Sequence, residues 1–265
     1  MLIQFTVHSS LLTVFGVWLV VELIGYKMRL MAKLVVIGTP IGNLEDISFR
    51  ALKRLDEVET LICEDTRVTG KLLQAYRQRG WLKNKPKLVA YNDYNAKLKL
   101  ERVRALIREE SLTGLVSDAG MPLISDPGYR LIRFCYDEEI EVEIVPGPSA
   151  VIEAVVASGF GGDRFMFNGF LPKKPGKLRK HLERLKSIWE IDQELRLVIF
   201  ISPHRLEREL MIMKDVFGGQ TLAVLLREMT KKFEERLESN LTNLVDLVKG
   251  KKIKGEMVLI LRQAV

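Results

Sequence analysis

The sequence predicts an α/β protein with an open, mostly parallel sheet architecture. Short apolar runs alternate along the chain with segments whose apolar residues recur at helical spacing. Each apolar run is followed at once by Gly, Pro or polar residues, as is typical of buried parallel strands. The chain has 265 residues, 47% of them hydrophobic, which suits one large or two modest domains with substantial cores.

The first half of the chain contains five expected strands separated by helices. The strands are expected at residues 33–38, 60–63, 87–90, 113–116 and 141–145. Helices are expected at 49–56 and 97–109, where apolar side chains recur at helical spacing. Asp126 and Pro127 predict another helix start, because Asp caps a helix and Pro at the first helical position loses no needed hydrogen bond.

The second half repeats the alternation after the motif PGPSA at residues 146–150. A helix of small residues is expected at 151–159, and four more strands are expected at 165–167, 195–201, 222–226 and 256–261. The motif marks the expected domain boundary. We therefore predict an N-terminal α/β domain at 33–147 and a separate C-terminal α/β domain at 148–265.

Residues 1–32 form an apolar N-terminal extension whose first 26 residues contain no Lys or Arg. A signal peptide would need a basic start. A membrane span would need about 20 apolar residues, and Glu22 interrupts the run. Two alternatives stay open: a weak anchor, and an artefact of gene calling with translation starting at Met28 or Met31. Under either, we expect a cytoplasmic body without stable membrane association.

The charge balance permits an anionic partner. Lys plus Arg is 41 against 34 Asp plus Glu, a formal net charge of +7 that suits nucleic acid or an anionic surface without requiring either. Cys63 and Cys135 lie in apolar surroundings and are interpreted as buried thiols. The three histidines are scattered without the spacing of metal ligands, so no metal site is expected.

Four loop motifs follow expected strands: GTPIGN, CEDTR, SDAGMPLISDPG and PGPSA. In open α/β sheets ligands bind beyond the carboxyl ends of the strands. The first motif is not a dinucleotide fingerprint, because Pro40 stands where a glycine is needed. The pair at Gly70 and Lys71 is not a phosphate-binding P-loop, because leucine follows it. The first motif is therefore interpreted either as a purely structural turn or as a turn that binds a ligand.

The motif SDAGMPLISDPG, residues 117–128, combines an apolar wall with a few fixed polar groups, as small-molecule sites do. Its Gly120 allows close approach of a ligand to the backbone. A structural reading, in which the carboxylates only cap turns, is favoured for Asp126 and not for Asp118.

The motif CEDTR places Glu64, Asp65 and Arg67 at a strand end. Adjacent carboxylates with an arginine suit general-base chemistry or hydroxyl binding. They equally suit an ordinary surface ion pair, which contributes little stability.

Three basic stretches lie at residues 77–87, 173–186 and 249–255. Each is interpreted either as a solvated face or as part of a surface that holds phosphates. Trp81, within the first stretch, offers a surface on which a base could stack.

Taken together, the motifs along the chain resemble those of a known protein family. GTPIGNLEDISFRAL, CEDTR, SDAGMPLISDPG, VPGPSA, GFLPKK, SPHRL and a REMTKKFEE…KGEMVLIL tail occur in this order, from about residue 33 to 261. The set resembles the ribosomal RNA small-subunit methyltransferase I family of the tetrapyrrole methylase superfamily. The resemblance implies two α/β domains of the tetrapyrrole methylase type with S-adenosyl-L-methionine in the cleft between them, and a homodimer. It implies 2′-O-methylation of a cytidine ribose in the decoding region of 16S ribosomal RNA, with that RNA or the small ribosomal subunit as partner.

The resemblance also implies which residues bind the cofactor. They are Gly38, Thr39, Pro40, Asp118, Ala119, Gly120, Pro122, Leu123, Ile124, Ser125, Pro148, Ser149, Ala150, Phe170 and Leu171. Two positions depart from the family pattern. Residues 91–95 lack the family's histidine, and a glutamate usual before SPHR is replaced at Phe200 and Ile201.

A ribose hydroxyl is a poor nucleophile, so methyl transfer to it benefits from a base. Our hypothesis is that Asp65 or Glu64 is this base and that Arg67 orients the RNA. Two other functions stay open. One is a tetrapyrrole or other small-molecule methylase, which would not need CEDTR and the basic stretches. The other is a non-enzymatic RNA-binding module, which would not need the intact cofactor motifs.

Overall fold

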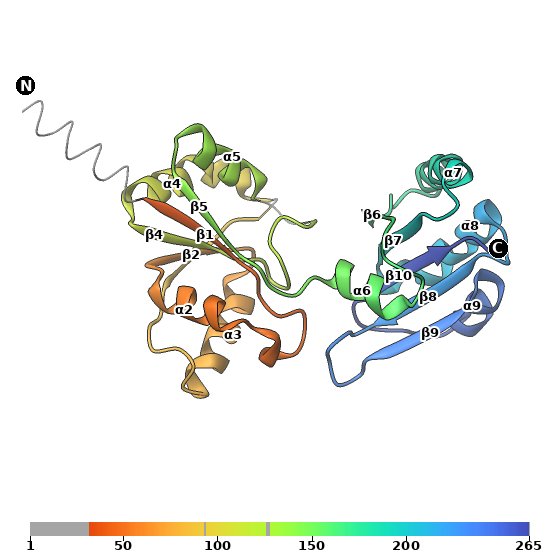
Figure 1. Cartoon of the computed structure of the whole chain (residues 1–265), viewed down its shortest axis with the longest axis horizontal. Helices are drawn as coiled ribbons and strands as arrows, with labels where there is room; N and C mark the ends of the chain where they lie inside the picture. The colour runs from red at the N-terminus through yellow and green to blue at the C-terminus, as the bar shows by residue number, and fades with distance from the viewer. Residues whose placement is uncertain (1–31, 93, 126–127, 265) are drawn as a thin grey trace, which may run out of the picture. The chain divides into compact units, whose positions relative to one another are not determined.

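A computed structural model describes residues 32–92, 94–125 and 128–264 (Figure 1). The expected helix start at Asp126 and Pro127, and the extension up to residue 31, lie outside the described residues. The chain divides into two compact units. The first contains Ile47–Gly147 and the described residues up to Thr39, and the second contains Pro40–Asp46 and Pro148–Val265. Each unit is described by itself.

The first unit is built on a five-stranded parallel sheet with the order β3-β2-β4-β1-β5. Its strands are β1 (Lys33–Ile37), β2 (Thr60–Cys63), β3 (Lys87–Ala90), β4 (Leu112–Leu115) and β5 (Glu141–Val145). All of β1 except its first residue is buried, as expected of a strand covered on both faces. The sequence predicted these strands correctly because each is a short apolar run closed by turn residues.

Helices cover both faces of this sheet. They are α2 (Phe49–Glu57), α3 (Thr66–Gln78), α4 (Ala96–Glu109) and α5 (Tyr129–Asp137). In Figure 1, α2 and α3 lie on one side of the sheet and α4 and α5 on the other. Leu34 and Val36 belong to a core with residues of α4 and α5, which leaves Val35 and Ile37 for the opposite face.

The sheet order places a topological switch point at its centre. After β1 the chain continues to β2 and β3, which lie toward one edge of the sheet. After β4 it continues to β5, which lies at the opposite edge. Since β1 and β4 are neighbours, their carboxyl ends meet where these connections part, which is the usual ligand crevice of an open α/β sheet. The loops that follow β1 and β4 are GTPIGN and SDAGMPLISDPG.

The second unit contains a five-stranded sheet with the order β6-β7-β10-β8-β9. Its strands are β6 (Phe165–Phe170), β7 (Arg196–Ile201), β8 (Leu222–Arg227), β9 (Glu235–Asn240) and β10 (Met257–Arg262). Only β6 and β7 are parallel, so the expectation of a mostly parallel sheet is wrong for this unit. Residues 228–234 join β8 to β9, and a loop this short makes a hairpin because a parallel crossover needs a dozen or more residues.

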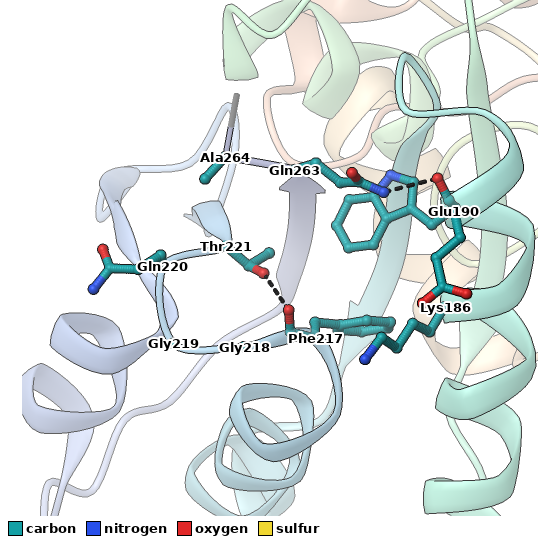
Figure 2. Close-up of a pocket in the computed structure, with 10 residues that line it drawn as sticks. Lys186, Glu190, Phe217, Gly218, Gly219, Gln220, Thr221, Gln263 and Ala264 are labelled. Carbon is teal, nitrogen blue, oxygen red and sulfur yellow. Dashed lines mark hydrogen bonds between the residues drawn. The ribbon is translucent and has the colours of Figure 1, made fainter.

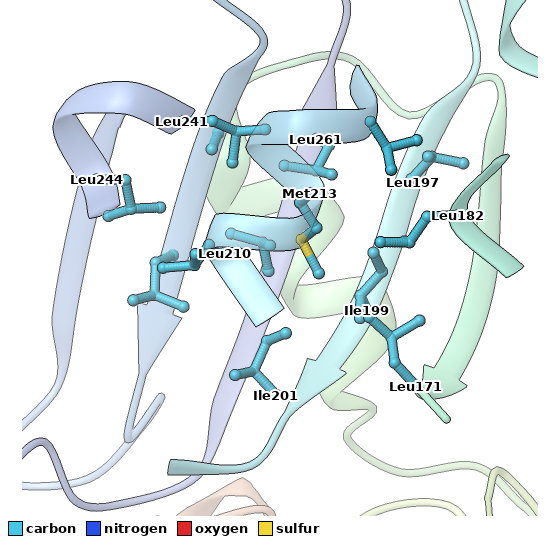
Figure 3. Packing of buried hydrophobic residues seen from close by; sticks show 14 of the residues in the cluster. Leu171, Leu182, Leu197, Ile199, Ile201, Leu210, Met213, Leu241, Leu244 and Leu261 are labelled. Atoms are coloured by element: carbon cyan, nitrogen blue, oxygen red, sulfur yellow. The ribbon is translucent and has the colours of Figure 1, made fainter. Parts of the chain in front are cut away.

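Helices cover both faces of the second sheet as well. They are α6 (Ala150–Ser158), α7 (Pro175–Ile191), α8 (Leu206–Phe217) and α9 (Leu241–Val248), with short 3₁₀ turns η1 (Leu44–Asp46) and η2 (Pro203–Arg205). Figure 3 shows the larger core, where Leu182 of α7, Met213 of α8 and Leu244 of α9 face strand residues such as Ile199. Residues of α6 and Ile41 fill the other face, which explains why Pro40–Asp46 belongs to this unit.

Candidate functional site

The carboxyl ends of β1, β4 and β5 converge in the first unit. The backbone N–H of Gly38 donates to the carbonyl of Val145 at 3.0 Å, and the N–H of Thr39 donates to the carbonyl of Gly120 at 2.9 Å. These bonds join the first residues after β1 to the end of β5 and to the loop after β4. Predicted cofactor residues from two separate motifs therefore lie side by side.

Gly38 and Gly147 are in backbone contact. A Cβ atom added to Gly38 would lie 2.6 Å from the amide nitrogen of Gly147, and one added to Gly147 would lie 2.9 Å from the Gly38 carbonyl carbon. The sulfur of Met121 accepts a hydrogen bond from the Gly147 N–H at 3.2 Å. Met121 was not among the predicted residues, since nothing in the sequence distinguishes it from a residue that fills a gap.

The loop after β4 is held by buried hydroxyls. The Ser117 hydroxyl donates to the carbonyls of Ala119 and Gly120, and the Thr39 hydroxyl donates to those of Ser117 and Gly120, over 3.2–3.4 Å. Leu123 has φ of 75° and Ser125 has φ of 72°, in the left-handed region that most side chains avoid. The loop is thus fixed in a strained shape, with Ala119 and Ser125 exposed at its surface.

Asp118 connects this loop to the motif after β2. Its carboxylate accepts a hydrogen bond from the backbone N–H of Asp65 at 3.1 Å. Burial raises the pKa of Asp118, and the nearby charge of Asp65 adds to the increase. The predicted catalytic motif and a predicted cofactor residue are therefore in direct contact.

Asp65 caps α3. Its carboxylate accepts from the backbone N–H of Arg67 at 2.8 Å and from the guanidinium of Arg67 at 2.6–3.2 Å. The hydrogen bonds from the Arg67 side chain and backbone lower the pKa of Asp65 to about 2. Asp65 is consequently ionised at neutral pH and weakly basic, while the Arg67 side chain remains 85% exposed.

Glu64 precedes this cap at the end of β2. Its backbone carbonyl accepts from the side-chain amide of Asn92 at 3.2 Å. Asn92 and Asn95 in turn exchange hydrogen bonds between side chain and backbone at the start of α4. Asn92, held by Asn95, thus supports the backbone of the predicted catalytic motif from the stretch where the chain departs from the family pattern.

The remaining predicted cofactor residues lie in the second unit. Ser149 and Ala150 stand at the start of α6, and Phe170, at the end of β6, is 59% exposed. Pro148 directly precedes the N-cap of α6. Pro40 also belongs to the second unit, although in the chain it comes shortly after β1 of the first unit. The predicted residues therefore form two groups, one in each unit.

Leu171 is buried in the large core, and its carbonyl accepts from the Arg205 guanidinium at 2.9 Å. Arg205 pairs at 2.7 Å with the carboxylate of Glu209, whose side chain is fully buried. Burial raises the pKa of Glu209, although the positive charge of Arg205 opposes the increase. This support could not be recognised from the sequence, because a four-residue spacing on a helix is equally typical of surface ion pairs.

The ring of Trp81 is less available for stacking on a base than the sequence suggested. Its ring stacks on Tyr76 with centroids 5.6 Å apart, and the guanidinium of Arg79 lies 5.1 Å from its centroid. The side chain remains 39% exposed. Neighbouring residues of the same unit therefore already contact the ring that was expected to stack on a base.

A hollow of about 360 Å³ in the second unit lies apart from the predicted residues of that unit (Figure 2). Its lining includes Phe217 and Trp189, whose rings meet edge to face at 5.1 Å. The carbonyl of Trp189 accepts from the side chain of Gln263, and Thr221 donates to the Phe217 carbonyl. None of its lining residues was predicted to bind the cofactor.

Cys63 and Cys135 are buried free thiols, as expected. Within the part of the chain that the structure describes, no three His, Cys, Asp or Glu residues are grouped so as to hold a metal ion. Among the same described residues, no helix has the length and hydropathy needed to cross a bilayer.

Comparison with known proteins identifies the family. The family model for tetrapyrrole (corrin/porphyrin) methylases matches residues 33–245. A Thermotoga maritima protein named ribosomal RNA small subunit methyltransferase I is 44% identical over 232 residues, which cover 87% of this chain and 98% of the relative. The chain belongs to the ribosomal RNA small subunit methyltransferase I family, within the tetrapyrrole methylases. A Mycoplasmopsis pulmonis member of the same name is 41% identical over 230 residues, covering 87% of this chain and 97% of the relative.

Solved structures share the fold of this methyltransferase I family member. The uroporphyrin-III C-methyltransferase of Thermus thermophilus matches with a TM-score of 0.59 and 19% identity, covering 87% of this chain and 94% of that one. Another structure of that Thermus thermophilus enzyme, complexed with S-adenyl homocysteine, matches with a TM-score of 0.57 and 14% identity, covering 87% and 97%. The fold is therefore the two-part α/β fold of the tetrapyrrole methylases, as the sequence predicted.

Proposed function

We propose that this protein transfers a methyl group from S-adenosyl-L-methionine to the 2′-oxygen of a cytidine ribose in the decoding region of 16S ribosomal RNA. One observation carries the proposal: the chain is 44% identical to a relative named ribosomal RNA small subunit methyltransferase I, over 87% of this chain and 98% of the relative. That relative's name supports methylation of small-subunit ribosomal RNA. The choice of atom and nucleotide is the finer part of the proposal and follows the motif resemblance.

The cofactor assignment has support from the fold and from the residues. A solved protein of the same fold is complexed with S-adenyl homocysteine, the form left after methyl donation. In the first unit, the residues after β1 and β4 combine backbone polar groups, the carboxylate of Asp118 and the half-exposed side chain of Ile124. This mixture of fixed polar groups and apolar surface fits a small amphipathic ligand.

Individual roles follow from these surroundings. Gly38, Thr39 and the loop 118–125 would bind polar parts of the cofactor through the backbone, because buried hydroxyls hold that backbone in place. In the second unit, Ser149 and Ala150 offer the N–H groups of the first turn of α6, and Phe170 offers an exposed apolar ring.

When bound, S-adenosyl-L-methionine supplies a methyl group on a positively charged sulfur. The residues around the ribose would orient its hydroxyl toward that methyl group and would accept the hydroxyl proton. Correct orientation of the hydroxyl supplies much of the rate. The protein's own contribution is therefore to position the RNA and to accept the proton.

The proposed base is Asp65 or Glu64, with Arg67 orienting the RNA. The exposed guanidinium of Arg67 suits contact with a phosphate. Asp65 has a pKa of about 2 because Arg67 binds it, so it would act as a base only if RNA draws Arg67 away. Asp118 touches the same motif and has a raised pKa, which makes it a third carboxylate for the same test.

Single-turnover kinetics with Glu64→Gln, Asp65→Asn and Asp118→Asn separates these carboxylates. Loss of a true general base should slow the chemical step by about 10²–10⁴-fold while RNA affinity stays intact. Glu101→Gln, at an exposed carboxylate on α4, is the matched control and should leave the rate unchanged. If all three variants react at the full rate with normal RNA affinity, the hypothesis of a carboxylate base is wrong.

Transfer of labelled methyl groups tests the function itself. The purified protein and labelled S-adenosyl-L-methionine are added to small ribosomal subunits that lack this modification, and the labelled nucleotide is mapped. We expect one labelled cytidine in the decoding region. Label in a small-molecule extract instead would favour a tetrapyrrole methylase, and RNA binding without transfer to either substrate would favour a non-enzymatic module.

We further propose that the protein is a cytoplasmic homodimer, as the family resemblance implies. Sedimentation equilibrium of the purified protein should give about twice the mass of one chain. A single-chain mass at micromolar concentration would contradict the dimer.

A further inference from the structure

A second hollow in the second unit has no role in the site described above. It has a volume of about 750 Å³ and lies between the start of α8, the end of α9 and the loop that leads to β10. We call it the basic groove. It is lined by Pro203, His204, Leu206, Glu207, Arg208, Met211, Val248, Lys251, Lys252, Ile253, Lys254 and Gly255.

The rim of the basic groove is positively charged. Arg208, Lys251, Lys252 and Lys254 are exposed, and within the described part of the chain no carboxylate forms a salt bridge with any of the three lysines. Arg208 donates to the carbonyl of Lys173 at 3.3 Å, and its charge acts on the buried carboxylate of Glu209. The acidic residue of the lining, Glu207, accepts a hydrogen bond from the backbone N–H of Gly250 at 3.3 Å. Cationic groups without carboxylate partners remain available to bind anions.

The interior of the basic groove is apolar. Leu206 and Val248 are 3% and 2% exposed, and Ile253 is partly buried. Met211 is 51% exposed at the edge of this apolar interior. A flexible thioether of this kind adapts its contacts to the flat faces of ligands. The groove therefore combines an apolar interior with a cationic rim.

The loop that carries the three lysines is fixed at both ends. At its start, Gly250 is bound by Glu207, and the Lys251 N–H donates to the carbonyl of Val248 at 3.0 Å. At its end, the Lys254 carbonyl accepts from Arg227 at 3.3 Å. Gly255 has φ of 104°, and a Cβ there would lie 2.6 Å from the Cγ of Glu228, so the turn requires glycine. A fixed backbone reduces the entropy lost when the lysines bind a ligand.

We propose that the basic groove binds an unpaired segment of RNA, with phosphates against the lysines and Arg208 and a base against Met211. Lysines that neutralise phosphates supply affinity, and apolar or aromatic surfaces that hold exposed bases are typical of single-strand recognition. The inference rests on the proposed function, since it takes the segment to belong to the ribosomal RNA that is methylated. The groove would hold that RNA outside the cofactor-binding residues.

The lysine contribution is tested with the triple variant Lys251→Gln, Lys252→Gln, Lys254→Gln. Its binding to a protein-free transcript of 16S ribosomal RNA is measured at several salt concentrations. Each lost phosphate contact should reduce the slope of log affinity against log salt by ~0.7, so three contacts should reduce it by about 2. The Michaelis constant for small ribosomal subunits should rise, and the rate at saturation should not change.

Two controls separate local contacts from general charge. The same three positions changed to arginine should keep the wild-type slope. Lys53→Gln, Lys97→Gln, Arg102→Gln changes the net charge equally at exposed positions on α2 and α4, and it should leave the slope unchanged. If this control lowers the slope as much as the groove triple does, the groove makes no specific contact and the inference is wrong.

The apolar contribution is tested with Met211→Ser. This exposed change should weaken binding of the transcript severalfold without altering the salt slope, because contact with a base releases no counterions. If Met211→Ser binds normally, and polyglutamate competes with the transcript for the protein, the groove is a general anionic-peptide surface and the inference is overturned.

Failure of this inference is distinguishable from failure of the proposed function. If the wild-type protein methylates small subunits and the groove triple keeps the wild-type affinity, slope and Michaelis constant, the groove inference alone is wrong. If no methyl group is transferred but the groove triple still lowers the slope for the transcript, the groove inference stands and the proposed function is wrong.

Discussion

Gly38 and Gly147 show how single residues fix the candidate site. Their backbones touch, so neither position has room for a side chain. The contact brings the ends of β1 and β5 together beside the loop after β4. The sequence placed both glycines in loop motifs, but their contact could not be predicted, because it depends on how three strands far apart in the chain align.

Gly38→Ala should lower stability by about 1–3 kcal/mol, since the added methyl group meets backbone atoms that cannot move independently. The matched control is Gly70→Ala in α3, where the nearest atom to the new Cβ is 3.7 Å away. The control should raise stability by about 0.5–1 kcal/mol, because alanine favours the helix. Urea denaturation measures both. Equal stability of the two variants would contradict the close contact.

Asp65 and Asp118 are neighbouring carboxylates in opposite environments. Hydrogen bonds from Arg67 stabilise the ionised form of Asp65, whereas burial destabilises the ionised form of Asp118. The contribution of Asp65 to stability is therefore present above its usual pKa of 3.8 and is lost as the pH falls toward about 2. For Asp118 the sign is reversed, because ionisation opposes folding above its raised pKa.

Asp65→Asn should lower the urea midpoint at pH 7, and its deficit should shrink as the pH falls from 4 toward 2. Asp118→Asn should leave the midpoint unchanged or raise it at pH 7. The asparagine oxygen still accepts the N–H of Asp65, and a partly buried charge is removed. A marked loss of stability in Asp118→Asn would show that the charge itself is needed for folding.

At the scale of elements, local pattern predicted the first sheet well. Its strands are apolar runs closed by Gly, Pro or polar residues, and the sequence shows both features. The second sheet was predicted less well. β9 has the pattern ERLESN, which does not read as a strand by itself and pairs only because β8 precedes it in a hairpin. The antiparallel pairing of β9 with β8 follows from the short loop between them, and the alternation of strands and helices alone does not predict it.

The ion pair between Arg205 and Glu209 joins η2 and α8 to the loop after β6. Arg205→Ala should cost about 3–5 kcal/mol, because it leaves the fully buried carboxylate of Glu209 without its cation. It should also weaken S-adenosyl-L-methionine binding by freeing the Leu171 carbonyl. The double variant Arg205→Met, Glu209→Leu should recover most of the lost stability.

The matched control is Arg133→Ala in α5, which removes an exposed ion pair with the same four-residue spacing to Asp137. It should change stability by less than about 1 kcal/mol. Thermal or urea unfolding measures all three variants. If Arg205→Ala costs no more than the control, the buried pair does not hold the loop after β6.

At the scale of the whole molecule, the order of the motifs carried more information than any one of them. Each loop motif taken alone is compatible with a structural turn, but their ordered set led to the family that the comparisons show. The sequence did not predict that Pro40–Asp46 belongs to the second unit, where Ile41 packs against α6. Which residues bind the cofactor and which carboxylate acts as base stay predictions, because they depend on ligands and not on the chain alone.

The most direct measurement is the resistance of the methylated nucleotide to alkali. Alkaline cleavage of RNA requires a free 2′-hydroxyl, so a 2′-O-methyl group protects the adjacent phosphodiester bond. After reaction with the purified protein and labelled S-adenosyl-L-methionine, small-subunit RNA should yield its label in an alkali-resistant dinucleotide that begins with cytidine. Label recovered in a single nucleotide would place the methyl group on a base and would contradict the proposed reaction.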